Sequence, residues 1–139
     1  METKAQFYLD FLRNFGLEPR LDDDGDVVFQ KDGMVFVLMA EERDPRFFRL
    51  LMPAFWKVDS DLERARALEA INEISLKYKI SKLAIVRERV VAMAELWMDL
   101  KRDLADEFDR ITSSLHISVR QFYLRMIHGM EVEQNAGDT

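Results

Sequence analysis

The stretch FFRLLMPAFWKVDSDLERARALEAIN, residues Phe47 to Asn72, decides the fold that we expect for this chain. It begins with an apolar run typical of a strand, which we expect to end at Pro53 because proline has no backbone N–H for a sheet ladder. An aromatic linker containing Phe55 and Trp56 follows this run. The stretch therefore predicts a strand, a linker and then a new element, without a nucleophile, a metal-ligand set or a phosphate loop.

A helix is predicted to start after the linker, because Ser60 and Glu63 form a capping box. It should run to about Lys77, with Asn72 in the middle of its apolar stripe. A buried amide is costly unless its hydrogen bonds are met, so we expect Asn72 to bond main-chain groups of a neighbouring element and fix how the helix docks. A ligand-binding role for Asn72 is the alternative. The stripe that we expect to be buried comprises Leu62, Ala65, Leu68, Asn72 and Leu76.

The sequence on either side predicts further short elements. Thr3 and Gln6 form a capping box for a helix that Gly16 ends. Two Asp-Gly pairs separate β-branched and aromatic runs, which is a strong hairpin signal. The predicted helices cover about 4–15, 60–77 and 100–128, and the predicted strands cover 17–21, 27–30, 34–40, 47–52, 80–86 and 90–98.

The last helix is the longest predicted element, with Asp99 as its N-cap. It would span roughly 40 Å at 1.5 Å per residue, which exceeds the width of the small sheet. Either Ser113 and Ser114 break it, or its far end packs on something else, such as a partner subunit. Its apolar stripe comprises Leu100, Leu104, Phe108, Ile111, Leu115, Val119, Phe122 and Met126.

The predicted order is α-β-β-β-β-α-β-β-α, which indicates an α+β fold with an antiparallel sheet and helices packed on one side. We expect a single domain over residues 1–130 and a disordered acidic tail over 131–139. The length of 139 residues is typical of one domain.

The composition excludes several functional classes. The chain has no cysteine, which rules out disulfides and thiol chemistry and fits a reducing compartment. Its net charge of -6 opposes nucleic-acid binding, and the basic residues between Lys77 and Arg89 are best read as a solvated hairpin face. No apolar run approaches a membrane span. We therefore expect a cytoplasmic protein that binds neither nucleic acid nor membrane.

No pattern in the chain predicts a catalytic residue, a metal site or a cofactor. The acidic stretch 22–26 fails the calcium-loop pattern, because Arg20 and Lys31 stand where acidic ligands are required. His116 and His128 lie on one predicted helix without an acid spaced to complete a metal site. A serine in a glycine elbow and a glycine-rich phosphate loop are both missing from the sequence. We expect a protein that is not an enzyme.

The aromatic and methionine content of the chain is the best functional lead. Phe55 and Trp56 stand in a linker where core packing does not obviously require them. The predicted strand 90–98 has apolar residues at both even and odd positions, so both of its faces are apolar, and the odd positions include Met93 and Trp97. Such a strand is either central or covered by a partner. We therefore expect these four side chains to contact a protein partner, and residues 90–97 with the last helix to form a dimer surface. Simple core packing is the alternative.

The element order resembles the fold of type III secretion chaperones, and local segments resemble the YbjN-like family of bacterial sensory transduction regulators. The similar segments are DGDVVFQKDGMVFVL, FFRLLMPAFWKVD, ALEAINEISLKYKISKL and a long helix ending FYLRM. Asn72 matches one amide of an Asn-x-x-Asn pattern, and Ser75 replaces the other. The resemblance implies a homodimeric module that binds proteins or peptides, in a chaperone-like or regulatory role. The alternative is a small-molecule-binding or enzymatic domain with a pocket near Asn72.

Overall fold

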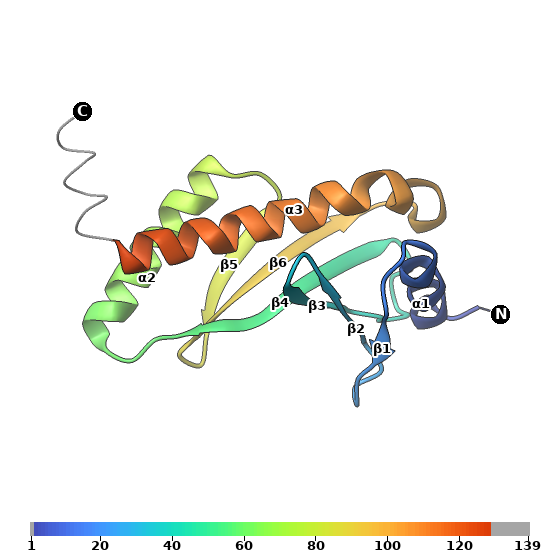
Figure 1. Cartoon of the computed structure of the whole chain (residues 1–139), viewed down its shortest axis with the longest axis horizontal. Coiled ribbons are helices and arrows are strands. Elements are labelled where there is room, and N and C mark those ends of the chain that lie inside the picture. The colour runs from blue at the N-terminus through green and yellow to red at the C-terminus, as the bar shows by residue number, and fades with distance from the viewer. Residues whose placement is uncertain (1, 129–139) are drawn as a thin grey trace.

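The computed structural model describes residues 2–128 and has the predicted order of elements (Figure 1). The acidic tail expected over 131–139 lies outside the described residues. The predicted N-caps are confirmed, since the Thr3, Ser60 and Asp99 side chains each accept a hydrogen bond from the backbone N–H three residues later. The helices are α1 (Lys4–Asn14), α2 (Asp61–Lys77) and α3 (Leu100–Ile127), and the strands are β1 (Arg20–Leu21), β2 (Val27–Lys31), β3 (Met34–Leu38), β4 (Phe47–Lys57), β5 (Ser81–Val86) and β6 (Arg89–Trp97).

The strands form one antiparallel sheet in the order β1-β2-β3-β4-β6-β5. The β2–β3 hairpin turns through Asp32 and Gly33, which both have positive φ, as the Asp-Gly signal predicts. The β5–β6 turn has positive φ at Arg87 and Glu88, which carry side chains that disfavour this conformation. In this order β6 lies between β4 and β5, in the interior of the sheet. This confirms the expectation that the strand is central.

Two predicted strand boundaries are wrong. β1 has only two residues, since Pro19 stands directly before it and cannot donate to a neighbour. β4 does not end at Pro53 but continues to Lys57, with a shift of register between Met52 and Trp56. Such an irregularity accommodates a residue that lacks a backbone donor, so Phe55 and Trp56 belong to the strand.

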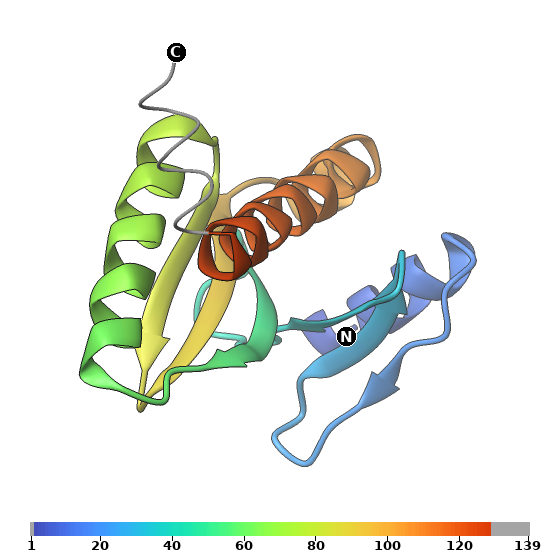
Figure 2. The same ribbon diagram turned by 60° about the vertical axis from the view of Figure 1, so that its left-hand side comes forward.

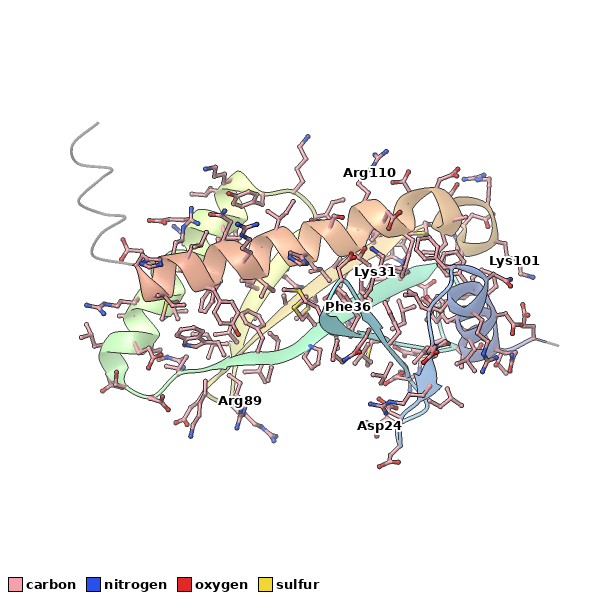
Figure 3. All side chains as sticks on the ribbon, in the orientation of Figure 1. Asp24, Lys31, Phe36, Arg89, Lys101 and Arg110 are labelled. Atoms are coloured by element: carbon pink, nitrogen blue, oxygen red, sulfur yellow. The ribbon has the colours of Figure 1, made fainter. Side chains whose placement is uncertain are left out.

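All three helices pack on one face of the sheet, as predicted. The ring of Tyr8 in α1 meets Phe48 of β4 edge-on at 6.3 Å, and Phe108 of α3 lies 5.7 Å from Phe29 of β2. The Nζ atom of Lys31 lies 2.9 Å from a carboxylate oxygen of Asp109, which ties β2 to α3. Figure 3 shows Lys31 and Phe36 between the sheet and α3, whereas Arg89 points away from the helices. The apolar core therefore lies between this face and the helices.

α3 is continuous through Ser113 and Ser114. The Ser114 hydroxyl donates to the carbonyl oxygen of Lys79 at 2.6 Å, and Ser118, which is fully buried, bonds the Ser81 hydroxyl. These serines therefore dock α3 on the start of β5 instead of breaking the helix. Every predicted stripe residue from Leu100 to Phe122 is buried.

The predicted buried face of α2 is wrong. Ala67, Ala70 and Ile74 face the core, whereas Asn72 is exposed to solvent. The side chain of Asn72 makes no hydrogen bond within residues 2–128, so it does not fix the docking of the helix. Small side chains let α2 approach its neighbours closely, and the leucines that dominate its hydrophobicity lie on the other side.

Candidate functional site

The face of the sheet that the helices leave uncovered carries a row of apolar side chains. Val37 of β3 pairs with Leu51 of β4, and Leu51 pairs with Met93 of β6. Paired residues of neighbouring strands point to the same face, and all three side chains are half-buried without a helix over them. Figure 1 shows α2 and α3 together over the other face of the sheet. We call this surface the open face; its members are Val28, Val35, Val37, Phe47, Arg49, Leu51, Lys82, Ala84, Val91, Met93, Glu95 and Trp97.

A row of charges crosses the open face beside the apolar row. Arg49 Nη2 lies 3.4 Å and Lys82 Nζ 3.1 Å from the two carboxylate oxygens of Glu95. Burial raises the pKa of Glu95, but the bonds and charges of Lys82 and Arg49 outweigh it and hold this pKa below its usual value. The carboxylate is therefore kept ionised between two cations, so this row carries a net positive charge and its carboxyl group is not a proton donor near neutral pH.

Trp97 ends β6 at the rim of the open face and is 69% exposed. Its ring centroid lies 5.8 Å from that of Phe47, and its Nε1 donates to Asp44 Oδ2 at 2.9 Å. The guanidinium of Arg49 lies 5.3 Å from the Phe47 ring. An indole held by its N–H, with one side in water, is a common anchor of protein interfaces.

The loop 41–46 that holds Asp44 is anchored by Lys4 at the start of α1. The Lys4 ammonium donates to the carbonyl oxygens of Glu41, Asp44 and Phe47, and its backbone N–H donates to the Glu42 carboxylate at 2.7 Å. Burial lowers the pKa of Lys4, and the neighbouring acidic groups, with Asp44 foremost, oppose that shift. Lys4 thus positions the loop that positions Trp97.

A hollow of about 430 Å³ adjoins the open face at its β1 edge. Val28, Gln30 and Val35 line it from the sheet, and Leu17 with Arg20 lines it from the segment before β1. β1 pairs with β2 only at Val27 and Val28. The hollow therefore continues from the open face with a lining of both polar and apolar side chains, and it offers space for a side chain of a bound segment.

Of the four predicted contact residues, the structure places Met93 and Trp97 on the open face and the other two elsewhere. Phe55 and Trp56 are half-buried and pack against the rings of Phe122 and Tyr123 of α3. Trp56 Nε1 donates to Glu63 at 2.8 Å, and the Tyr123 hydroxyl donates to the carbonyl oxygen of Phe55 at 2.7 Å. Core packing thus accounts for both aromatic residues of β4.

Sequence reasoning missed the charged row and the anchoring lysine. Arg49, Lys82 and Glu95 are joined only by strand pairing, although the alternation of residues 47–51 indicates that Arg49 shares a face with Phe47 and Leu51. No sequence signal marks Lys4, because its partners are backbone carbonyls.

Asn72 lines none of three hollows on the surface of residues 2–128, the one beside the start of α1, the one beside β1 and the one beside Met39. It is an exposed residue on the outer side of α2. None of these three hollows is therefore the pocket expected beside Asn72.

The carboxylates of Asp22, Asp24 and Asp26 lie within 4.8 Å of one another. Asp22 Oδ1 accepts from the N–H groups of Asp24 and Asp26, and Asp26 accepts from Ala40 N–H at 2.9 Å. These bonds shape the acidic turn before β2 and join it to the end of β3.

Over residues 2–128, none of the helices combines the length and the apolar character that crossing a membrane requires.

Comparison with known protein families identifies the family of this chain. A family model described as TY-Chap1, "T3SS (YopN, CesT) and YbjN peptide-binding chaperone 1", matches residues 9–116. Searches of curated proteins and of solved structures found no match. The family match covers more than half of the 139 residues and includes every strand of the sheet. The chain therefore belongs to the TY-Chap1 family of T3SS and YbjN peptide-binding chaperones.

Proposed function

We propose that the chain is a non-enzymatic peptide-binding module that works as a homodimer and holds an apolar segment of a partner protein on its open face. The observation that carries this proposal is the row Val37, Leu51 and Met93, which is apolar, spans three strands and has no helix over it. Membership of a peptide-binding chaperone family supports the same function. We place it in the cytoplasm, which suits a chain without cysteine.

The chemistry of the open face defines the segment that fits it. Burial of the apolar row against partner side chains would supply the binding free energy, and Met93 adapts its shape to different partners. Trp97 would close over one end of the segment, and the charges around Glu95 would be matched by polar groups at its edge. The segment is therefore expected to be rich in aliphatic and aromatic residues, with few charges.

Selection from a displayed library of random peptides tests this proposal with the full chain. We expect apolar sequences to be selected, and their affinity to fall at least about tenfold for Met93→Glu, because a carboxylate would then lose water on binding. Leu21→Glu is the matched control, since Leu21 is an exposed leucine of β1 and lies outside the open face. A library without binders, or binders indifferent to Met93→Glu, would contradict the proposal.

A further inference from the structure

Two positive side chains stand directly opposite each other at one end of the sheet. Lys57 ends β4 and is paired with Arg89, the first residue of β6. The next pair along this ladder is joined by a hydrogen bond of 2.7 Å from the N–H of Val58 to the carbonyl oxygen of Glu88. In the alternating antiparallel pattern, Lys57 and Arg89 therefore form the kind of pair that lacks mutual hydrogen bonds and brings its side chains closest. We call these two residues the cation pair.

The cation pair continues the open face beyond its apolar row. Arg89 points away from the helices in Figure 3, and side chains alternate along β6, so Arg89 shares its face with Val91 and Met93. Val86, the partner of Arg89 in β5, is 51% exposed and adds an apolar neighbour. Four residues of β6, about 13 Å, separate Arg89 from Met93. Figure 2 shows the turn between β5 and β6 at the lower end of these strands.

The rest of the described chain does little to neutralise the cation pair. The Nζ atom of Lys57 lies 3.9 Å from an oxygen of Asp59, and both side chains are mostly exposed, so this ion pair is weak. Neither Glu88 nor any other acidic group of residues 2–128 forms an ion pair with Arg89. Like charges directly opposite each other destabilise a sheet. An acidic group from outside the chain would remove that cost.

Positive charge is concentrated on this side of the sheet. The charged residues of β4, β5 and β6 are four cations and one carboxylate, namely Arg49, Lys57, Lys82, Arg89 and Glu95. The whole chain, in contrast, has a net charge of -6. A local excess of one charge sign beside an apolar surface favours an occupant of the opposite sign. Charge complementarity therefore indicates that the occupant is acidic.

The opposite end of β6 carries negative charge instead. The carboxylate of Asp44 accepts a hydrogen bond from Trp97 and belongs to an exposed residue. Trp97 lies eight residues from Arg89, about 26 Å along the strand. Asp44 would repel an acidic group bound near Trp97, whereas the cation pair would attract one. The two ends of the face thus differ in the charge that they accept.

We propose that the segment held on the open face carries an acidic side chain that binds between Lys57 and Arg89, four residues from the side chain that packs on Met93. The inference rests on the peptide-binding function proposed above and defines the class of segment. Four residues of extended chain span about 13 Å, and an even spacing directs both side chains to the same side. The Arg89 guanidinium can donate two parallel hydrogen bonds to one carboxylate, and the Lys57 ammonium can donate another. The few charges of the segment are therefore negative and lie at one end.

Peptide selection on the full chain tests the inference, with wild type and Arg89→Gln used in parallel. We expect Asp or Glu four positions from a large apolar residue to be enriched among the binders of wild type and not among those of Arg89→Gln. Arg120→Gln is the matched control, because Arg120 is an exposed arginine of α3, over the other face of the sheet. Its binders should show the same acidic residue as those of wild type.

Affinity measurements on one selected peptide test the direct contact. Replacing its acidic residue by the corresponding amide should raise the Kd for wild type at least about fivefold, because charged hydrogen bonds are lost. The same replacement should change the Kd for Arg89→Gln little, since the two changes remove one interaction. An equal loss of affinity for both chains would place the acidic residue elsewhere and would overturn the inference.

Thermal unfolding separates binding from a structural role. Arg89→Gln removes one of two facing cations, so its melting temperature should equal or exceed that of wild type. A variant that binds acidic peptides more weakly and also unfolds at a lower temperature would show that Arg89 supports the fold. That result would overturn the assignment of Arg89 to the ligand.

Failure of this inference differs from failure of the peptide-binding function. Binders that Met93→Glu weakens but that show no acidic preference would overturn the cation pair as a binding site and keep the function. A library without binders would overturn both. A DNA duplex or a phosphatidylserine vesicle whose binding is lost in Arg89→Gln, combined with no acidic preference among peptides, would assign the cation pair to phosphate groups and overturn the inference.

Discussion

Trp97 and Asp44 are joined by a hydrogen bond of 2.9 Å from the indole Nε1 to the carboxylate Oδ2, across 53 positions of the sequence. This hydrogen bond from Trp97 is the main reason why the pKa of Asp44 lies below its usual value. Asp44 is itself held in place because its carbonyl oxygen accepts a hydrogen bond from the Lys4 ammonium at 3.0 Å. The orientation of an aromatic side chain on the open face thus depends on a lysine at the start of α1.

Lys4→Met is expected to lower the free energy of unfolding by about 2 kcal/mol or more, because three carbonyl oxygens lose a charged donor in a partly buried place. Urea unfolding measures this loss. The fluorescence of Trp97 should also change, since the loop holding Asp44 loses its anchor. Lys101→Met, at an exposed lysine of α3, is the control and should change stability little. Equal stability of the two variants would contradict the anchoring role.

The charged row of the open face predicts a dependence of stability on pH. The pKa of Glu95 is lower in the folded chain than its ordinary value of 4.5, so its stabilising contribution is present above pH 4.5 and is lost as pH falls through the folded pKa. Glu95→Gln should therefore be less stable than wild type at pH 7, and the difference should shrink below pH 4.5. Urea unfolding at a series of pH values measures it.

Asp106→Asn is the control for the pH series, because Asp106 is exposed and forms no ion pair within residues 2–128. Its stability should follow that of wild type at every pH. A difference between wild type and Glu95→Gln that stayed constant from pH 7 to about pH 3 would show that Glu95 acts only through packing.

The hydroxyl of Tyr8 is buried and has no hydrogen-bond partner within residues 2–128. Burial also raises the pKa of Tyr8. Removing an unsatisfied hydroxyl removes a desolvation cost, so Tyr8→Phe should keep or raise the free energy of unfolding, by up to about 1 kcal/mol. Tyr123→Phe is the comparison, because the Tyr123 hydroxyl donates to Phe55 and its loss should cost about 1 kcal/mol. A clear destabilisation by Tyr8→Phe would refute this view of Tyr8.

The turn between β5 and β6 holds Arg87 and Glu88 at φ values of 49° and 67°. This conformation is costly for residues with a Cβ and suits Asn-Gly. Replacing both residues together, Arg87→Asn with Glu88→Gly, should raise the free energy of unfolding by about 1 kcal/mol, which thermal unfolding measures. The double change to alanine is the control. It removes the same side chains without relieving the backbone, so a similar gain from alanine would refute the explanation.

Local chemistry made most of the element order predictable from the sequence. The three capping residues mark the helix starts, and Asp32 with Gly33 marks a hairpin, because these side chains satisfy or permit the backbone next to them. Met93 and Trp97 were also predictable as members of a second strand face, because side chains alternate along a strand. The charged row was not, because its members come from three strands whose pairing is a long-range property.

By itself, then, the sequence determined the order of the helices and strands and that one strand is apolar on both faces, since these depend on neighbours along the chain. Only the tertiary structure decided which side of α2 is buried. Hydrophobicity favoured burial of Leu62, Leu68 and Leu76, but Ala67, Ala70 and Ile74 face the core. Close packing explains this choice, because small side chains let the helix approach the layer beneath it. The bulkier leucines lie exposed to solvent on the other side of the helix.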